Sequence, residues 1–210
     1  MTSRRTLSMV LLSLVIGART TEGGQADDRE QKVQYLLNFT EYVEWPASAF
    51  ANAKAPIVIG VIGEDPFGEA LTKQAAEHRG PRRVEVRRFK GIREFRGQET
   101  PGRRQDELEA KKRAKRRELR ACHVLYVSQS EDELLSEVFG AVRKAPVLTV
   151  GEKPAFARQG GVIDFFRAHP DPRLRFEINL AAAKAANLKV SSKLLALAKP
   201  IHEEDAQAKP

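Results

Sequence analysis

Short runs of apolar, β-branched residues alternate with helix-like segments along most of the chain. The run PIVIGVIG (56–63) is continuous, which is typical of a strand buried on both faces of a parallel sheet. The segment EDPFGEALTKQAAEH follows it directly, and the two together predict the strand, loop and helix that open a βαβ unit. Three further runs predict strands: VEVRRF (84–89), CHVLYVS (122–128) and PVLTV (146–150).

The last third of the chain predicts the end of this sheet. After PVLTV, a loop leads to the pair Gly160–Gly161, then to the apolar run GVIDFF and a Pro-Asp-Pro turn. The run LRFEI after the turn predicts a strand added antiparallel to its neighbour. We expect an Ala-rich helix next, and a last short helix that opens at Ser191–Ser192.

A first helix is predicted before the sheet. Residues 29–44 place apolar side chains along one helical face. Trp45–Pro46 ends this helix, because proline disfavours helical backbone at the residue before it. We expect Trp45 to pack as a lid on the core, and ligand stacking is the alternative.

Two later helix starts have capping signals. Asp65 fits an N-cap, and Pro66 fits the first position of the helix after it. Ser130 and Glu133 have the spacing of a capping box, which predicts a helix from there to about Val142.

The start of the chain has the features of a secretory signal peptide over residues 1–26. Arg4 and Arg5 precede an uncharged run of 12 residues, Leu7–Ala18. That run is short for a membrane span, which needs about 20 apolar residues. The small residues of Gly24-Gln25-Ala26 fit a cleavage site. An uncleaved membrane anchor is the alternative.

Length and composition predict one exported α/β domain over residues 27–200, followed by a disordered tail at 201–210. The chain has 210 residues, of which 41% are hydrophobic, enough for a core. Cys122 is the only cysteine, so no intramolecular disulfide can form. Folding must therefore depend on the core.

Much of the net charge of +8 lies in one segment. Residues 93–120 carry 11 Lys/Arg against 6 Asp/Glu. The stretch DELEAKKRAKRREL has high helix propensity but almost no apolar stripe, so we expect 96–120 to be a solvated insertion in a crossover. The basic run 111–117 could contact lipid headgroups or a cell-wall polymer, and a solvated face is the alternative. It lacks stacking aromatics, and no nucleic-acid partner is expected.

The glycines after the first strand do not form a nucleotide site. Gly60, Gly63 and Gly68 lack the GxGxxG spacing, and no P-loop Lys-Ser/Thr pair is present. Glu64 and Asp65 occupy the place of a pyrophosphate and would repel it. We expect no cofactor.

Catalytic and metal-binding patterns are missing from the sequence. Cys122 and His123 are neighbours in a predicted strand, so their side chains point to opposite faces and cannot form a thiol–base pair. We expect Cys122 to be a small buried hydrophobic residue. No HxH, HExxH or CxxC spacing occurs, so no metal site is predicted. We therefore expect that the protein is not an enzyme.

Four phenylalanines gather in the last third of the chain: Phe156, Phe165, Phe166 and Phe176. Phe165 and Phe166 are adjacent in a predicted strand and must face opposite sides. One of them is either covered by a helix or exposed, and an exposed aromatic ring is a candidate for partner binding. Full burial of both rings is the alternative.

An ordered set of segments extends through the domain from about Lys32 to Ala198. In order they are YLLNFTEYVEWP (35–46), IVIGVIGEDPFGEAL (57–71), the Cys-His opening of CHVLYVS, PVLTVGEKPAFARQGGVIDFF and RFEINLAAAKAANLKVSSKLLALA. This set resembles the YfiR-like family of exported regulators. The insertion 96–120 departs from the family, where that crossover is usually much shorter. The extra cysteines that form disulfides in some members are missing here.

The resemblance implies a fold and a role. Together with the strand and helix pattern, it implies a Rossmann-like three-layer α/β/α sandwich. Its sheet would be mostly parallel, with about five to six strands and an added antiparallel edge strand. The implied protein is a periplasmic, non-catalytic regulator, commonly a homodimer.

In the best-known member of that family, the domain binds and represses the periplasmic part of a membrane-bound diguanylate cyclase. An outer-membrane lipoprotein relieves the repression, and lower cyclic-di-GMP output reduces biofilm formation. The partner implied here is such a cyclase or another membrane-bound sensor. A periplasmic small-ligand sensor is the alternative function.

Two sets of residues are candidates for binding. The first lies near the presumed sheet edge and is predicted to contact a protein partner: Phe165, Phe166 and Glu177. The second would line a ligand pocket beyond the carboxyl ends of the strands, where open α/β sheets bind ligands: Glu64, Asp65 and Ser128.

Overall fold

The structure is a computed structural model that describes residues 22–93, 105–167 and 173–200. Its main sheet has the strand order β3-β2-β4-β5-β6-β7-β9 in these residues. The strands are β2 (Ile57–Ile62), β3 (Val84–Phe89), β4 (Val124–Val127), β5 (Leu148–Gly151), β6 (Ile163–Arg167), β7 (Leu174–Ile178) and β9 (Lys199–Pro200). The first five are parallel to one another. Strand β7 is antiparallel to β6, and β9 is parallel to β7.

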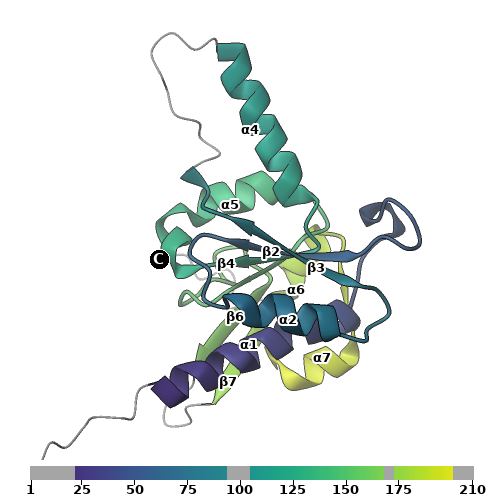
Figure 1. Ribbon diagram of the computed structural model, residues 1–210, viewed down its shortest axis with the longest axis vertical. Helices are drawn as coiled ribbons and strands as arrows, with labels where there is room; N and C mark the ends of the chain where they lie inside the picture. Colours follow the sequence, from purple (N-terminus) through teal and green to yellow (C-terminus); the bar gives the residue numbers. More distant parts are fainter. Residues whose placement is uncertain (1–21, 94–104, 168–172, 201–210) are drawn as a thin grey trace, which may run out of the picture.

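Helices cover the sheet on both sides and make three layers (Figure 1). One layer contains α1 (Glu22–Tyr42), α2 (Glu69–Glu77), α6 (Leu180–Ala185) and α7 (Ser192–Leu197). The other contains α4 (Gln105–Arg120) and α5 (Leu135–Val142). The predicted three-layer, mostly parallel α/β fold is confirmed. The two-residue strand β9 lies outside β7, so the antiparallel strand is second from the edge.

Short elements complete the chain. Strands β1 (Val43–Glu44) and β8 (Lys189–Val190) pair antiparallel in a separate small sheet. The 3-10 helix η1 (Ala47–Ala49) follows β1, and η2 (Gln129–Leu134) precedes α5.

The larger core lies between α1 and the sheet. It buries the apolar stripe predicted for residues 29–44 against the inward side chains of β2, β4, β6 and β7. Four aromatic rings meet there: Tyr35 and Phe39 of α1, Phe165 of β6 and Phe176 of β7. Trp45 packs at the margin of this core, and its Nε1 donates to the carbonyl of His123 (3.2 Å). The expectation that Trp45 is a lid on the core is confirmed.

Both capping predictions were wrong, because the side chains concerned bind elsewhere. Helix α2 begins at Glu69, after Gly68, and the carboxylate of Asp65 instead accepts from the backbone N–H of Phe67 (2.7 Å). This is a local Asx turn, which competes with capping. The Ser130 hydroxyl accepts from the N–H of Glu64 (3.0 Å), and the segment begins as 3-10 helix before α5.

The charged insertion forms helix α4, which extends away from the body of the molecule (Figure 1). Leu119, in its last turn, is buried and joins α4 to the smaller core, while the Lys/Arg side chains before it are exposed or half-buried. Residues 96–104 of the predicted insertion lie outside the described residues. The solvated helix that the polar pattern predicted is therefore present from residue 105 onward.

The predicted leader and tail fall largely outside the described residues. Residues 1–21 and 201–210 are not described, and the predicted cleavage site at 24–26 lies in the first turn of α1. None of the described helices is long and apolar enough to cross a bilayer.

Candidate functional site

The order of the parallel strands creates one topological switch point. From β2 the chain proceeds to β3 on one side, and then crosses back to β4 on the other side. Open α/β sheets bind ligands beyond the carboxyl ends of two such strands. Glu64 and Asp65 follow β2, and Ser128 follows β4, so the structure brings all three to this edge. We call the space between these strand ends the switch-point crevice.

The chain itself fills the switch-point crevice. Glu131, on η2, is 6% exposed, and its Oε2 accepts from the backbone N–H of Ile92 at 2.7 Å. Gly91 lies so close that a Cβ there would come within 2.8 Å of Oε1. Gly63, at φ +91°, leaves room for Ser130, because a Cβ there would come within 2.3 Å of its hydroxyl oxygen. A carboxylate therefore occupies the position at which other folds of this topology hold a ligand.

The residues predicted for a ligand pocket are used within the fold or are exposed beside it. Ser128 is buried, and its N–H donates to Ile62 O (3.0 Å). Asp65 pairs with Arg88 (Nε to Oδ2, 2.6 Å), and Glu64 is exposed. The structure therefore collects the three residues, of which only Glu64 is exposed.

Sequence reasoning missed a polar network at the carboxyl ends of β4 and β5. Lys32 of α1 and Glu152 form a half-buried ion pair at 2.5 Å, and the hydroxyl of Tyr126 donates to the same carboxylate. Burial, reinforced by the Glu152 charge, raises the pKa of Tyr126, so its phenol stays protonated. The network fixes α1 to the sheet. Lys32 and Glu152 are 120 positions apart in the sequence, so no local sequence pattern links them.

Cys122 and His123 lie just before β4 and contact different layers, as adjacency predicted: Cys122 Sγ donates to Glu118 O of α4 (3.7 Å), whereas the His123 ring packs against Trp45. Burial raises the pKa of the Cys122 thiol to about 12, so it is not a nucleophile. The His123 ring lies between Trp45 and Phe50, and its Nδ1 accepts from Val58 N (3.0 Å). Burial lowers the pKa of His123 and keeps the ring neutral. Within the described part of the chain, no cluster of three or more His, Cys, Asp or Glu could hold a metal ion.

The predicted partner residues Phe165 and Phe166 lie on opposite faces of β6. Phe165 is 2% exposed inside the aromatic cluster of α1, and its ring cannot reach a partner at the surface. Phe166 is half-buried on the other face, with Lys199 Nζ 5.8 Å from its ring centroid. The prediction that one ring stays at least partly exposed therefore applies to Phe166 and not to Phe165.

This other face of β6, β7 and β9 has no helix over it in the described residues. The smaller core takes its strand residues from β2 and β4, with Val147 just before β5, and none from β6, β7 or β9. Alternation along the strands places Phe166, Arg175 and Glu177 on this side. Lys199 is the register partner of Glu177 and shares its side. We call the surface formed by Phe166, Arg175, Glu177 and Lys199 the open face.

A buried carboxyl borders the open face. Asp164 is 3% exposed, lies opposite Glu177 in the strand register, and its Oδ1 has no hydrogen-bond partner. Burial and the nearby Glu177 charge raise the pKa of Asp164 to about 7. Sequence reasoning named Glu177 but missed Arg175 and Lys199. The alternation in LRFEI, with apolar Leu174, Phe176 and Ile178, was a signal for Arg175.

Comparisons with known proteins agree with this architecture. The sequence has no significant match among curated proteins. A crystal structure titled as a conserved domain protein from Vibrio cholerae O1 biovar El Tor is similar, with a TM-score of 0.52 and 13% identity. The match covers 82% of this chain and 59% of that chain, and at this identity it shows the fold alone. The model of the YfiR/HmsC-like family matches residues 29–199. Since this match covers most of the chain, the protein belongs to the YfiR/HmsC-like family.

Proposed function

We propose that this protein is an exported regulator that binds a membrane-bound signalling protein through the open face. The family is known for periplasmic regulators and not for catalysis. The proposal adds that residues 1–26 direct export and that the partner contacts β6, β7 and β9.

The observation that carries the proposal is the open face. A sheet is normally covered on both sides in a parallel α/β fold, yet this half lacks a helix in the described residues. It presents a half-buried aromatic ring among Arg175, Glu177 and Lys199, a mixture typical of protein interfaces with a partly apolar centre and a charged rim.

Two features of the rest of the molecule support a binding role. The Cys122 thiol and the His123 ring are held in unreactive forms. The switch-point crevice is occupied by Glu131. The open face therefore remains as the candidate for recognition, and it is not the ligand site that is usual in α/β folds.

The proposed partner is the periplasmic domain of a diguanylate cyclase, which this protein represses, with an outer-membrane lipoprotein relieving the repression. A homodimer is part of the same proposal. These finer statements rest on the family membership.

Cyclic-di-GMP in whole cells tests the proposal. Deleting the gene should raise the cyclic-di-GMP level, and the wild-type gene should restore it. A Phe166→Ala, Glu177→Lys double variant should accumulate normally but fail to restore the level. An unchanged level in the deletion strain would refute the cyclase as partner. Full restoration by the double variant would refute the open face as the contact.

A further inference from the structure

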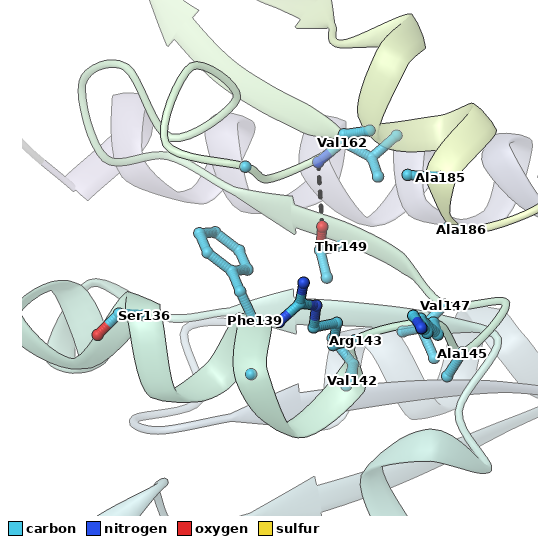
Figure 2. A pocket seen from close by; sticks show the side chains of 14 residues that line it. Ser136, Phe139, Val142, Arg143, Ala145, Val147, Thr149, Val162, Ala185 and Ala186 are labelled. Carbon is cyan, nitrogen blue, oxygen red and sulfur yellow. Dashed lines mark hydrogen bonds between the residues drawn. The ribbon is translucent and has the colours of Figure 1, made fainter. Parts of the chain in front are cut away.

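A separate cavity of about 390 Å³ opens at the amino-terminal ends of β5 and β6 (Figure 2). This is the opposite edge of the sheet from the switch-point crevice. Its walls come from α5, from the turns before β5 and β6, and from α6. The volume lies in the range of small-molecule sites. The apolar part of the lining consists of Phe139, Val142, Ala145, Val147, Val162, Ala182, Ala185 and Ala186.

Two exposed cationic residues, Arg143 and Lys144, line this cavity, and no carboxylate is among its described lining residues. Arg143 and Lys144 follow the end of α5, and Figure 2 shows the Arg143 guanidinium directed into the cavity on the side of Thr149. Among the described residues, no ion pair joins either side chain to an acid. The cavity therefore combines an apolar wall with uncompensated positive charge, and charge complementarity favours an anion.

The backbone holds both cations in a turn that is unfavourable for lysine. The N–H of Ala145 donates to Val142 O (2.9 Å), with Arg143 at φ −52°, ψ 132° and Lys144 at φ 59°. This is the pattern of a type II turn, whose third position favours glycine or asparagine. A β-carbon in left-handed backbone is strained, and such strain is often retained at functional sites.

The helix end does not need these side chains as caps. Cations near a helix C-terminus often bind its free carbonyls. Here Val142 O already accepts from Ala145 N, and Arg143 O accepts from the guanidinium of Arg120 (2.8 Å). The side chains of Arg143 and Lys144 therefore remain free to bind a ligand.

A hydroxyl donor lies on the opposite wall. The Oγ1 of Thr149 accepts from the N–H of Val162 at 3.0 Å (Figure 2). That bond uses a lone pair of the oxygen, so the hydroxyl hydrogen can still be donated to an acceptor in the cavity. Arg143, Lys144 and Thr149 together offer three donor side chains around one apolar space.

We propose that this cavity binds a small monocarboxylate with an apolar body, such as an aromatic or medium-chain acid. The carboxylate would lie between Arg143, Lys144 and Thr149, and the apolar body would rest on Phe139, Val162 and the alanines of α6. The proposal concerns binding at a second site and does not depend on the open face.

Calorimetric titration with phenylacetate tests the site. We expect saturable binding of one phenylacetate per chain. Phenylacetamide, which keeps the ring but lacks the charge, and acetate, which keeps the charge but lacks the ring, should each bind at least tenfold more weakly. Absence of saturable phenylacetate binding, or equal binding of the amide, would overturn the proposal.

Two single variants separate binding from folding. Lys144→Gly relieves the left-handed backbone and should raise the melting temperature, yet weaken phenylacetate binding at least tenfold. Gly140→Leu places a side chain where a Cβ meets nothing within 4 Å, and it should block the cavity while the helix stays folded. Arg116→Gln, at an exposed cation of α4 outside the cavity lining, is the matched charge control and should leave binding unchanged. If both variants bind phenylacetate like the wild type, the site is elsewhere and the proposal is wrong.

Discussion

The two halves of the sheet differ in what covers their faces. In the half formed by β3, β2, β4 and β5, helices cover both faces, and the polar groups at the carboxyl edge bind one another, as Glu131 does with Ile92 N–H. In the half formed by β6, β7 and β9, one face has helices over it and the other is the open face. There a buried carboxyl oxygen, Asp164 Oδ1, has no partner.

This difference shows where the molecule is structural and where it is available for binding. Buried polar groups in native proteins are nearly always satisfied, but the covered half also holds an exception, His123 Nε2, so this property alone does not separate the two halves. The two halves are separated by the half-buried ring of Phe166, which lies on a sheet face without a helix over it in the described residues. The contrast favours the open face as the contact surface, and each prediction below measures one side of it.

The largest effect is expected from two adjacent phenylalanines. Phe165→Ala removes a fully buried ring from the aromatic cluster and should cost about 3–5 kcal/mol in the free energy of unfolding. Phe166→Ala, on the open face, should cost about 1 kcal/mol or less, since it loses a half-exposed ring and one cation–π contact. Urea unfolding of both variants measures the difference. Equal costs would contradict the assignment of the two faces.

A smaller effect is expected at the switch-point crevice. Glu131→Ala leaves the buried N–H of Ile92 without its acceptor, which should cost about 1–3 kcal/mol. The exposed neighbour Glu133→Ala is the control and should change stability by about 0.5 kcal/mol or less. Chemical denaturation checks both. If the two variants are equally stable, Glu131 is not a structural filling of the crevice.

The pH dependence of stability tests Asp164. Its pKa of about 7 in the folded protein lies above its ordinary value of 3.8, so the folded state binds the proton more tightly. The resulting stabilisation is complete below about pH 4 and is lost as the pH rises through 7. Between pH 5 and 8, wild type should lose about 2–3 kcal/mol more than Asp164→Asn does. Parallel losses in the two proteins would show that Asp164 titrates normally.

Much of the fold could be predicted from local patterns. The continuous run 56–63 and the alternation in LRFEI correctly indicated a buried parallel strand and an antiparallel strand. The helix starts failed at Asp65 and Ser130, because each side chain found a competing partner that depends on the tertiary structure. Sequence adjacency also placed Phe165 and Phe166 on opposite faces, but it could not tell which face lacks a helix.

The site was harder to predict, because its contacts also depend on the tertiary structure. The strand pattern correctly predicted that Glu64, Asp65 and Ser128 lie at one edge of the sheet. It could not predict that Glu131 fills this crevice, because Glu131 binds Ile92, which is 39 residues away along the chain. The cavity between α5 and α6 is lined by segments about 40 residues apart in the sequence. The turn at Lys144 contains no glycine, so the sequence did not indicate it.

Site-specific photo-crosslinking tests the central claim, that the open face contacts a membrane partner, most directly. A photoreactive amino acid would replace Phe166 or Glu177 on the open face, or Lys73 on the exposed side of α2 as the control. We predict that positions 166 and 177 crosslink to one membrane-bound signalling protein in intact cells, whereas position 73 does not. Crosslinking from position 73 alone, or from none of the three positions, would contradict the account.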